Sequence, residues 1–161
     1  MQTIDIHIPK AQVFDEVAKT TAFVGAHLLD KKIMGYESVA LTDGDREMIE
    51  RYWREACAEV STLIRRYATR ISDHERPHGT DISVSADYKA ELVMSDRYDA
   101  SQTDSLNAEL FSFAVNSIVS KWFMIANKEE CAGYMAAAQG AMENAKIKLH
   151  NKTAPTPPIN P

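Results

Sequence analysis

The string His74-Glu75-Arg76-Pro77-His78 matches a catalytic motif in both residue type and spacing. In zinc proteases, His-Glu-x-x-His on a continuous helix directs two imidazoles at the metal and sets the glutamate beside the metal-bound water. His74 and His78 would then be the ligands and Glu75 the general base. Pro77 interrupts this turn, where a proline costs about 3 kcal/mol or more. The string therefore favours a loop at a helix end, and a zinc-dependent hydrolase is the second alternative function.

A second set of residues imitates a calcium-binding loop. Asp43, Asp45 and Glu47 have the spacing of its first three ligands. The sixth position, which needs glycine, is Met48, and the twelfth, which needs a bidentate glutamate, is Arg54. The sequence also lacks a glycine-rich phosphate loop and a Gly-x-Ser-x-Gly string. We therefore expect a protein that is not an enzyme and that has no cofactor, no metal site and no catalytic residue.

Arginines supply the third kind of chemistry, contact with the phosphates of a nucleic acid. The net charge is -5, whereas most nucleic-acid-binding domains carry a basic excess. Acidic residues also alternate with the first arginines, which is typical of a solvated helix surface with ion pairs. Nucleic-acid binding or DNA packaging is therefore the first alternative rather than the favoured function. Its candidate phosphate contacts are Arg51, Arg54, Arg65, Arg66, Arg70 and Arg76.

The composition bounds the fold. A chain of 161 residues with 45% hydrophobic and 25% charged residues is typical of one globular domain. It has neither the roughly 18 consecutive apolar residues of a membrane span nor the basic start of a signal peptide, so we expect no membrane partner and a location in the cytoplasm or in a particle assembled there. Cys57 and Cys131 each lie on an apolar helix stripe, which predicts buried thiols rather than a disulfide framework.

The longest helix signal runs from Asp43 to about Ala68. Thr42 and Asp45 have the spacing of a capping box at its start. Apolar residues then recur every three or four positions, which predicts a helix with one buried face. These residues are Met48, Ile49, Tyr52, Trp53, Ala56, Cys57, Val60, Leu63, Ile64 and Tyr67.

Short strands and a first helix surround this element. Ile4, Ile6 and Ile8 alternate with polar residues, which predicts a strand that ends at Pro9. A helix follows over residues 10–29. A second alternating pattern predicts a β-hairpin at about 81–94, with its turn at residues 87–89. The first strand and this hairpin would form a small three-stranded sheet, because an isolated hairpin is marginally stable.

Two more helices complete the expected domain. Thr103 would cap a helix that continues to Ile125 and is apolar over more than one stripe, so it should be central. Asn127 would cap the last helix, which reaches Leu149. Residues 153–161 contain four prolines and should be extended. The predicted fold is mainly α, a four-helix domain over residues 1–152 with a small antiparallel β-hairpin or sheet.

These elements carry a resemblance to a known family. The segment Thr42-Asp43-Gly44-Asp45 opens a long helix containing Tyr52-Trp53-Arg54-Glu55-Ala56, and Ser120-Lys121-Trp122-Phe123 follows in a later aromatic helix. Together with the helix from Tyr134 to Leu149, this order resembles the head-tail connector, or neck and adaptor, proteins of tailed phages and prophages. The segment from Val13 to Ala26 also resembles small prophage structural proteins.

The resemblance implies a non-enzymatic structural protein of virion assembly. Its partners would be further copies of the same chain in a ring, and other virion proteins such as portal or tail subunits. A ring subunit needs surfaces that pack on neighbours as well as a core of its own. The aromatic residues that could serve a partner surface or internal packing are Tyr52, Trp53, Phe111, Trp122, Phe123 and Tyr134.

Overall fold

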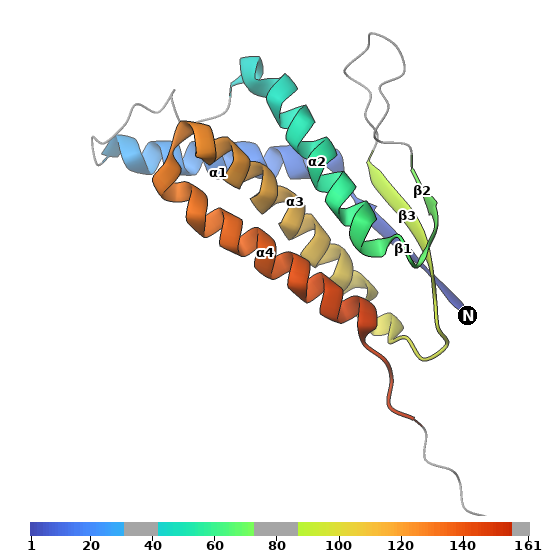
Figure 1. The fold of residues 1–161 in the computed structure, drawn as a ribbon. Coiled ribbons are helices and arrows are strands. Elements are labelled where there is room, and N and C mark those ends of the chain that lie inside the picture. Colours follow the sequence, from blue (N-terminus) through green and yellow to red (C-terminus); the bar gives the residue numbers. More distant parts are fainter. Residues whose placement is uncertain (31–41, 73–86, 156–161) are drawn as a thin grey trace, which may run out of the picture.

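The computed structural model describes residues 1–30, 42–72 and 87–155, with the side chains of residues 28–30 and 43 left out. Four α-helices and a small antiparallel sheet make up this part of the chain, so the predicted mainly α fold is confirmed (Figure 1). The order is β1 (Gln2–Ile8), α1 (Lys10–Asp30), the 3-10 turn η2 (Asp43–Asp45), α2 (Arg46–Ile64), β2 (Ala68–Ile71), β3 (Tyr88–Met94), the 3-10 turn η3 (Ala100–Gln102), α3 (Thr103–Ala126) and α4 (Lys128–His150).

The sheet has the order β1-β3-β2, with both neighbours antiparallel to the central β3. Ile4 is opposite Leu92 and Ile6 is opposite Ala90. Since side chains alternate across a strand, this register gives the sheet one buried and one exposed face. The residues buried on β1 and β3 are Ile4, Ile6, Ile8, Tyr88, Ala90, Leu92 and Met94.

The expected hairpin is partly corrected. Its first strand lies outside the described residues. Its predicted turn is wrong at Tyr88 and Lys89, because these residues begin β3 and pair with Ile8 and His7 of β1. The side chain of Tyr88 is fully buried, and its hydroxyl lies 2.9 Å from the hydroxyl of Ser61 in α2. Burial of the aromatic ring and strand pairing on both sides therefore override the weak turn signal.

The capping box predicted from Thr42 and Asp45 is confirmed in part. Both the backbone amide and the hydroxyl of Thr42 donate to Asp45 Oδ2, at 2.9 and 2.7 Å. The predicted end of this helix at Ala68 is wrong, because α2 ends at Ile64 and Ala68 begins β2. The amide of Val93 donates to the Tyr67 carbonyl at 2.8 Å, so pairing with β3 takes over from the helix.

The apolar stripe of α2 is buried as predicted. Trp53 is fully buried and meets Phe14 of α1 edge to face, with ring centroids 6.2 Å apart. Cys57 is also buried, as is Cys131 in α4, and both thiols are free of disulfides. The Cys131 thiol donates to the Ser120 carbonyl at 3.3 Å. Both cysteines therefore act as small core residues.

α3 is the central helix, in contact with α1, α2, α4 and β1. The prediction of a broadly apolar central helix is confirmed by its many buried residues, although Ile125, expected on the apolar surface, is 64% exposed. Thr103 is its first helical residue rather than its cap. At the start of α4, Asn127 Oδ1 accepts from the Glu129 amide at 3.2 Å, which confirms the predicted cap.

The chain after α4 is held against the segment that connects β3 to η3. The Thr153 amide donates to the Arg97 carbonyl at 2.8 Å, and Lys152 forms a β-bridge with Tyr98. The start of the proline-rich segment is therefore tied to its own domain. Residues 156–161 of the predicted extended tail lie outside the described residues.

Candidate functional site

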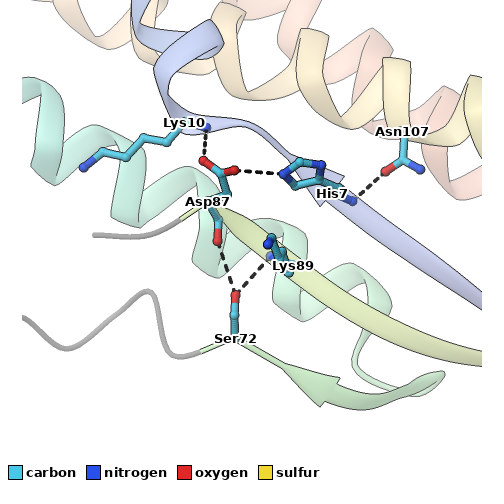
Figure 2. Close-up of polar contacts among 6 residues, drawn as sticks. All are labelled: His7, Lys10, Ser72, Asp87, Lys89 and Asn107. Carbon is cyan, nitrogen blue, oxygen red and sulfur yellow. Dashed lines mark hydrogen bonds and ion pairs between the residues drawn. The ribbon is translucent and has the colours of Figure 1, made fainter. Parts of the chain in front are cut away.

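A polar junction joins β1, α1, β2 and β3 at one end of the sheet (Figure 2). Asp87, directly before β3, is at its centre. One carboxylate oxygen lies 2.9 Å from His7 Nε2, and the other accepts from the Lys10 backbone amide at 3.0 Å. Because Lys10 is the first residue of α1, Asp87 caps that helix from a distant part of the chain.

Histidine, aspartate and Ser72 meet at this junction, which raises the question of nucleophilic catalysis. In a serine nucleophile the imidazole accepts the hydroxyl proton, while the carboxylate orients the imidazole from the other side. Here the Ser72 hydroxyl contacts the backbone, accepting from the Lys89 amide at 3.0 Å and reaching the Asp87 carbonyl at 3.5 Å. These contacts of the Ser72 hydroxyl continue the strand pairing between β2 and β3. They therefore serve to link the two strands.

The electrostatics of Asp87 agree with a structural role. The hydrogen bond with His7 holds the pKa of Asp87 below its ordinary value of 3.8; partial burial opposes this and the Lys10 amide adds to it. The carboxylate is therefore ionised at neutral pH, as a charge-assisted acceptor needs to be. An ionised carboxylate near a helix N-terminus also has a favourable interaction with the helix dipole.

Asn107 of α3 protects the free edge of β1 next to this junction. Its Oδ1 accepts from the His7 amide at 2.9 Å, and its Nδ2 donates to the Asp5 carbonyl at 3.2 Å. The side-chain amide thus takes the place of a neighbouring strand over one pair of backbone groups. Covering a sheet edge in this way hinders pairing with another chain.

The exposed face of the sheet forms an open hollow of about 480 Å³. Both charge signs are present in it: Asp5 and Glu91 lie opposite each other, and Arg70 is opposite Glu91 on the other side. Thr69 donates to the Glu91 carboxylate at 2.9 Å. Such a balanced surface selects neither an anion nor a cation. Its lining residues are Asp5, Ile6, His7, Arg70, Ser72, Lys89, Ala90 and Glu91.

A second hollow of about 260 Å³ lies over α3, between α2 and α4. We call it the methionine groove, because Met124, Met135 and Met142 line it. Drug-sized ligands occupy clefts of roughly 300–1,000 Å³, so this groove suits a side chain better than a cofactor. Figure 1 shows α3 lying between α2 and α4. The full lining is Glu59, Phe113, Ser117, Ser120, Lys121, Met124, Met135, Ala138, Gln139, Met142 and Glu143.

The six aromatic candidates pack within the chain. Tyr52, Trp53, Trp122 and Phe123 are buried in the core. Phe111 and Tyr134 are half-buried against it. Among the described residues, the large apolar side chains that are exposed belong to other positions, namely Met1, Phe23, Met124, Ile125, Met135 and Ile147.

The candidate arginines fall into two groups. Arg51 lies 3.7 Å from Glu55 and over the ring of Tyr52, so its charge is engaged on α2 itself, where Arg54 is half-buried. Around the end of α2, Arg65, Arg66 and Arg70 are exposed, and Arg66 lies over the ring of Tyr67. Arg76 lies outside the described residues.

The zinc-protease string and its candidate ligands, His74, Glu75 and His78, also lie outside the described residues. Within residues 1–30, 42–72 and 87–155, no three His, Cys, Asp or Glu side chains gather closely enough to hold a metal ion. None of the helices in that part of the chain is both long enough and apolar enough to cross a bilayer.

Comparison with protein-family models, curated proteins and solved structures finds no match for this chain.

Sequence reasoning missed Asp87 and Asn107, because their partners lie about 80 and 100 residues away. It also missed the exposure of Phe23, although a signal was present. Val13, Val17, Thr21 and Val24 form the buried stripe of α1, and Phe23 is out of phase with it.

Proposed function

We propose that this chain is a non-enzymatic structural protein of a phage or prophage particle, of the head-tail connector type. The resemblance in the order of helices and in the segments Thr42–Asp45, Tyr52–Ala56 and Ser120–Phe123 suggests the class. The observation that carries the proposal is the methionine groove, an apolar hollow left open beside a complete core. Flexible, polarizable methionine side chains are common on surfaces that bind proteins.

A rigid frame around the groove supports the same proposal. Lys121 of α3 lies 2.9 Å from Glu55 and 3.6 Å from Glu59, which joins α3 to α2. On the other side, Lys148 of α4 lies 2.6 Å from Glu109 of α3. A groove whose walls are braced before binding loses less conformational entropy when a partner docks. An assembly subunit needs such a preformed surface.

The direct test is made on particles from the host that encodes the chain. After prophage induction, we expect the protein in purified tailed particles at several copies each, by quantitative mass spectrometry. Deletion of its gene should yield filled heads without tails, and expression from a plasmid should restore them. Normal tailed particles from the deletion strain would contradict the proposal.

Nucleic-acid binding is the second candidate, favoured by the exposed Arg65, Arg66 and Arg70 around the end of α2. If these residues contact phosphates, the affinity for duplex DNA should fall steeply with salt, because each contact releases a counterion. Replacing the three by glutamine should weaken binding and reduce the salt slope by about three. Arg51→Gln is the matched control, since Arg51 is paired with Glu55. Unchanged DNA binding in the triple variant would exclude this surface.

A further inference from the structure

Positive charge is concentrated in two short segments of an acidic chain. Residues 65–70 and 144–153 contain six of its 18 Lys and Arg residues and none of its 23 Asp and Glu residues. The first segment begins where α2 ends, and the second covers the end of α4 and the residues after it. Such an uneven distribution of charge along one chain points to an anionic partner.

The fold brings these two segments together. The rings of Tyr67 and His150 meet edge to face, with their centroids 6.1 Å apart. The guanidinium of Arg66 lies over the Tyr67 ring, 5.4 Å from its centre. Figure 1 shows α2 and α4 ending on the same side of the molecule. We call the shared surface the basic end, and its exposed cations are Arg65, Arg66, Lys146 and Lys152.

The four cations of the basic end are available to a ligand. In the part of the chain that the structure describes, the ion pairs with carboxylates all involve other residues. Lys148 is not counted among the four, because it pairs with Glu109 of α3. Basic residues also suit the negative end of a helix dipole, but that interaction falls off within the last turn. Arg65, Arg66 and Lys152 come after the last residues of α2 and α4.

Most carboxylates around the basic end are already engaged. Asp96 pairs with the N-terminal ammonium, and Asp99 accepts hydrogen bonds at the start of η3. Glu91 is opposite Arg70, which we therefore also leave out of the basic end. Glu143 of α4 lies one turn before the lysines and lines the methionine groove. The field at this end of the molecule is therefore positive, although the whole chain is acidic.

We infer that the basic end binds the phosphate backbone of duplex DNA, with contacts from both α2 and α4. A guanidinium stacked on a ring is held in place while its N–H edge stays free for a phosphate, as at Arg66. Tyr67 is half-buried under this guanidinium, so its ring offers little platform for an unpaired base. Ile147 is the one large apolar side chain exposed in the two segments, which is too little to anchor a lipid surface.

The inference rests on the second candidate function and extends it from the end of α2 to the end of α4. It does not depend on the connector role. The new content is that lysines far from the arginines in sequence belong to the same surface. Their removal should therefore weaken DNA binding in the same salt-dependent way.

Fluorescence anisotropy with a labelled duplex oligonucleotide tests the α4 half of the surface in the full chain, between about 50 and 200 mM KCl. The double variant Lys146→Gln, Lys152→Gln should bind more weakly and reduce the salt slope by about two, one for each lost phosphate contact. Lys128→Gln is the matched control, because Lys128 is an exposed lysine at the other end of α4, about 27 Å from Lys146. It should change neither the affinity nor the slope. All three positions are exposed, so the fold should persist, which circular dichroism checks.

The possible results separate this inference from the functions it extends. Binding that is weakened by loss of the α2 arginines but not of the two lysines would overturn the joint surface and leave the second candidate function standing. No DNA binding by the unaltered chain would overturn both. Tighter binding of a single strand of equal length would overturn the assignment to duplex DNA, which has the denser charge. Binding to vesicles containing phosphatidylserine but not to DNA would also overturn it, and the particle experiment tests the connector role separately.

Discussion

Lys10 Nζ lies 2.6 Å from Glu50 Oε1, so a nearly buried ion pair joins the start of α1 to α2. The side chains are 11% and 5% exposed, and the Lys10 ammonium also lies 5.1 Å from the centre of the Phe14 ring. Water screens such a pair much less than it screens a surface pair. Removing one partner leaves an uncompensated charge in the interior, which is the main cost of breaking it.

We therefore expect Glu50→Gln and Lys10→Met each to lower the free energy of unfolding by about 3–5 kcal/mol in urea denaturation. The double variant Lys10→Met, Glu50→Leu should lose clearly less than the sum of the two, because no unpaired charge remains. Lys19→Met, at an exposed pair with Asp15, should leave the free energy of unfolding essentially unchanged and is the control. Strict additivity in the double variant would contradict a coupled pair.

Asn107→Ala should destabilise the sheet edge. It removes two hydrogen bonds to β1, at about 0.5–1.5 kcal/mol each, and uncovers the backbone groups of Asp5 and His7. We expect a lower free energy of unfolding and faster concentration-dependent aggregation, followed by turbidity. Asn116→Ala is the matched control, because Asn116 bonds only locally to the Ser112 carbonyl in the same helix. Equal effects of the two variants would show that the edge needs no cover.

The junction at Asp87 predicts a specific pH dependence. Its pKa in the folded chain is below 3.8, so the stabilisation it gives is complete above the unfolded-state value and is lost as the pH falls through the folded-state value. Asp87→Ala should cost about 1 kcal/mol at pH 7, as for other helix caps. This difference should shrink below about pH 4, measured by thermal unfolding across pH. A pH-independent difference would contradict the assignment.

Asp87→Asn separates charge from geometry, since the amide oxygen can still accept from Lys10. It should retain part of the cap and lose the interaction with His7.

Cys57 and Cys131 should be inert in the native protein. Both thiols are buried, and thiolate chemistry needs access to solvent. Labelling by Ellman's reagent should be slow and should accelerate with urea, because it requires opening of the core. Cysteine placed at the exposed Ile147 should label at once and is the control. Rapid labelling of the unmodified chain would show that α2 or α4 opens readily.

Several features of the fold follow from local sequence. The i, i+3/i+4 recurrence from Ile49 to Ile64 predicted the buried face of α2, and the alternation of Ile4, Ile6 and Ile8 predicted β1. Asn127 as the cap of α4 and the burial of both cysteines were also predictable. These features depend on side-chain period or on neighbours within a few residues, so they are visible without tertiary structure.

Other features were decided by contacts between distant residues. Glu50 reads as part of a solvated, mixed-charge surface, yet packing of α1 against α2 buries it beside Lys10. Pairing with β3 ended α2 at Ile64 and began β2 at Ala68, although the apolar pattern continued to Tyr67. The candidate aromatic residues are buried or half-buried, while Phe23, Met124 and Met135 are exposed. Sequence period gives each element its faces, but which face meets another element depends on the free energy of the whole packed core.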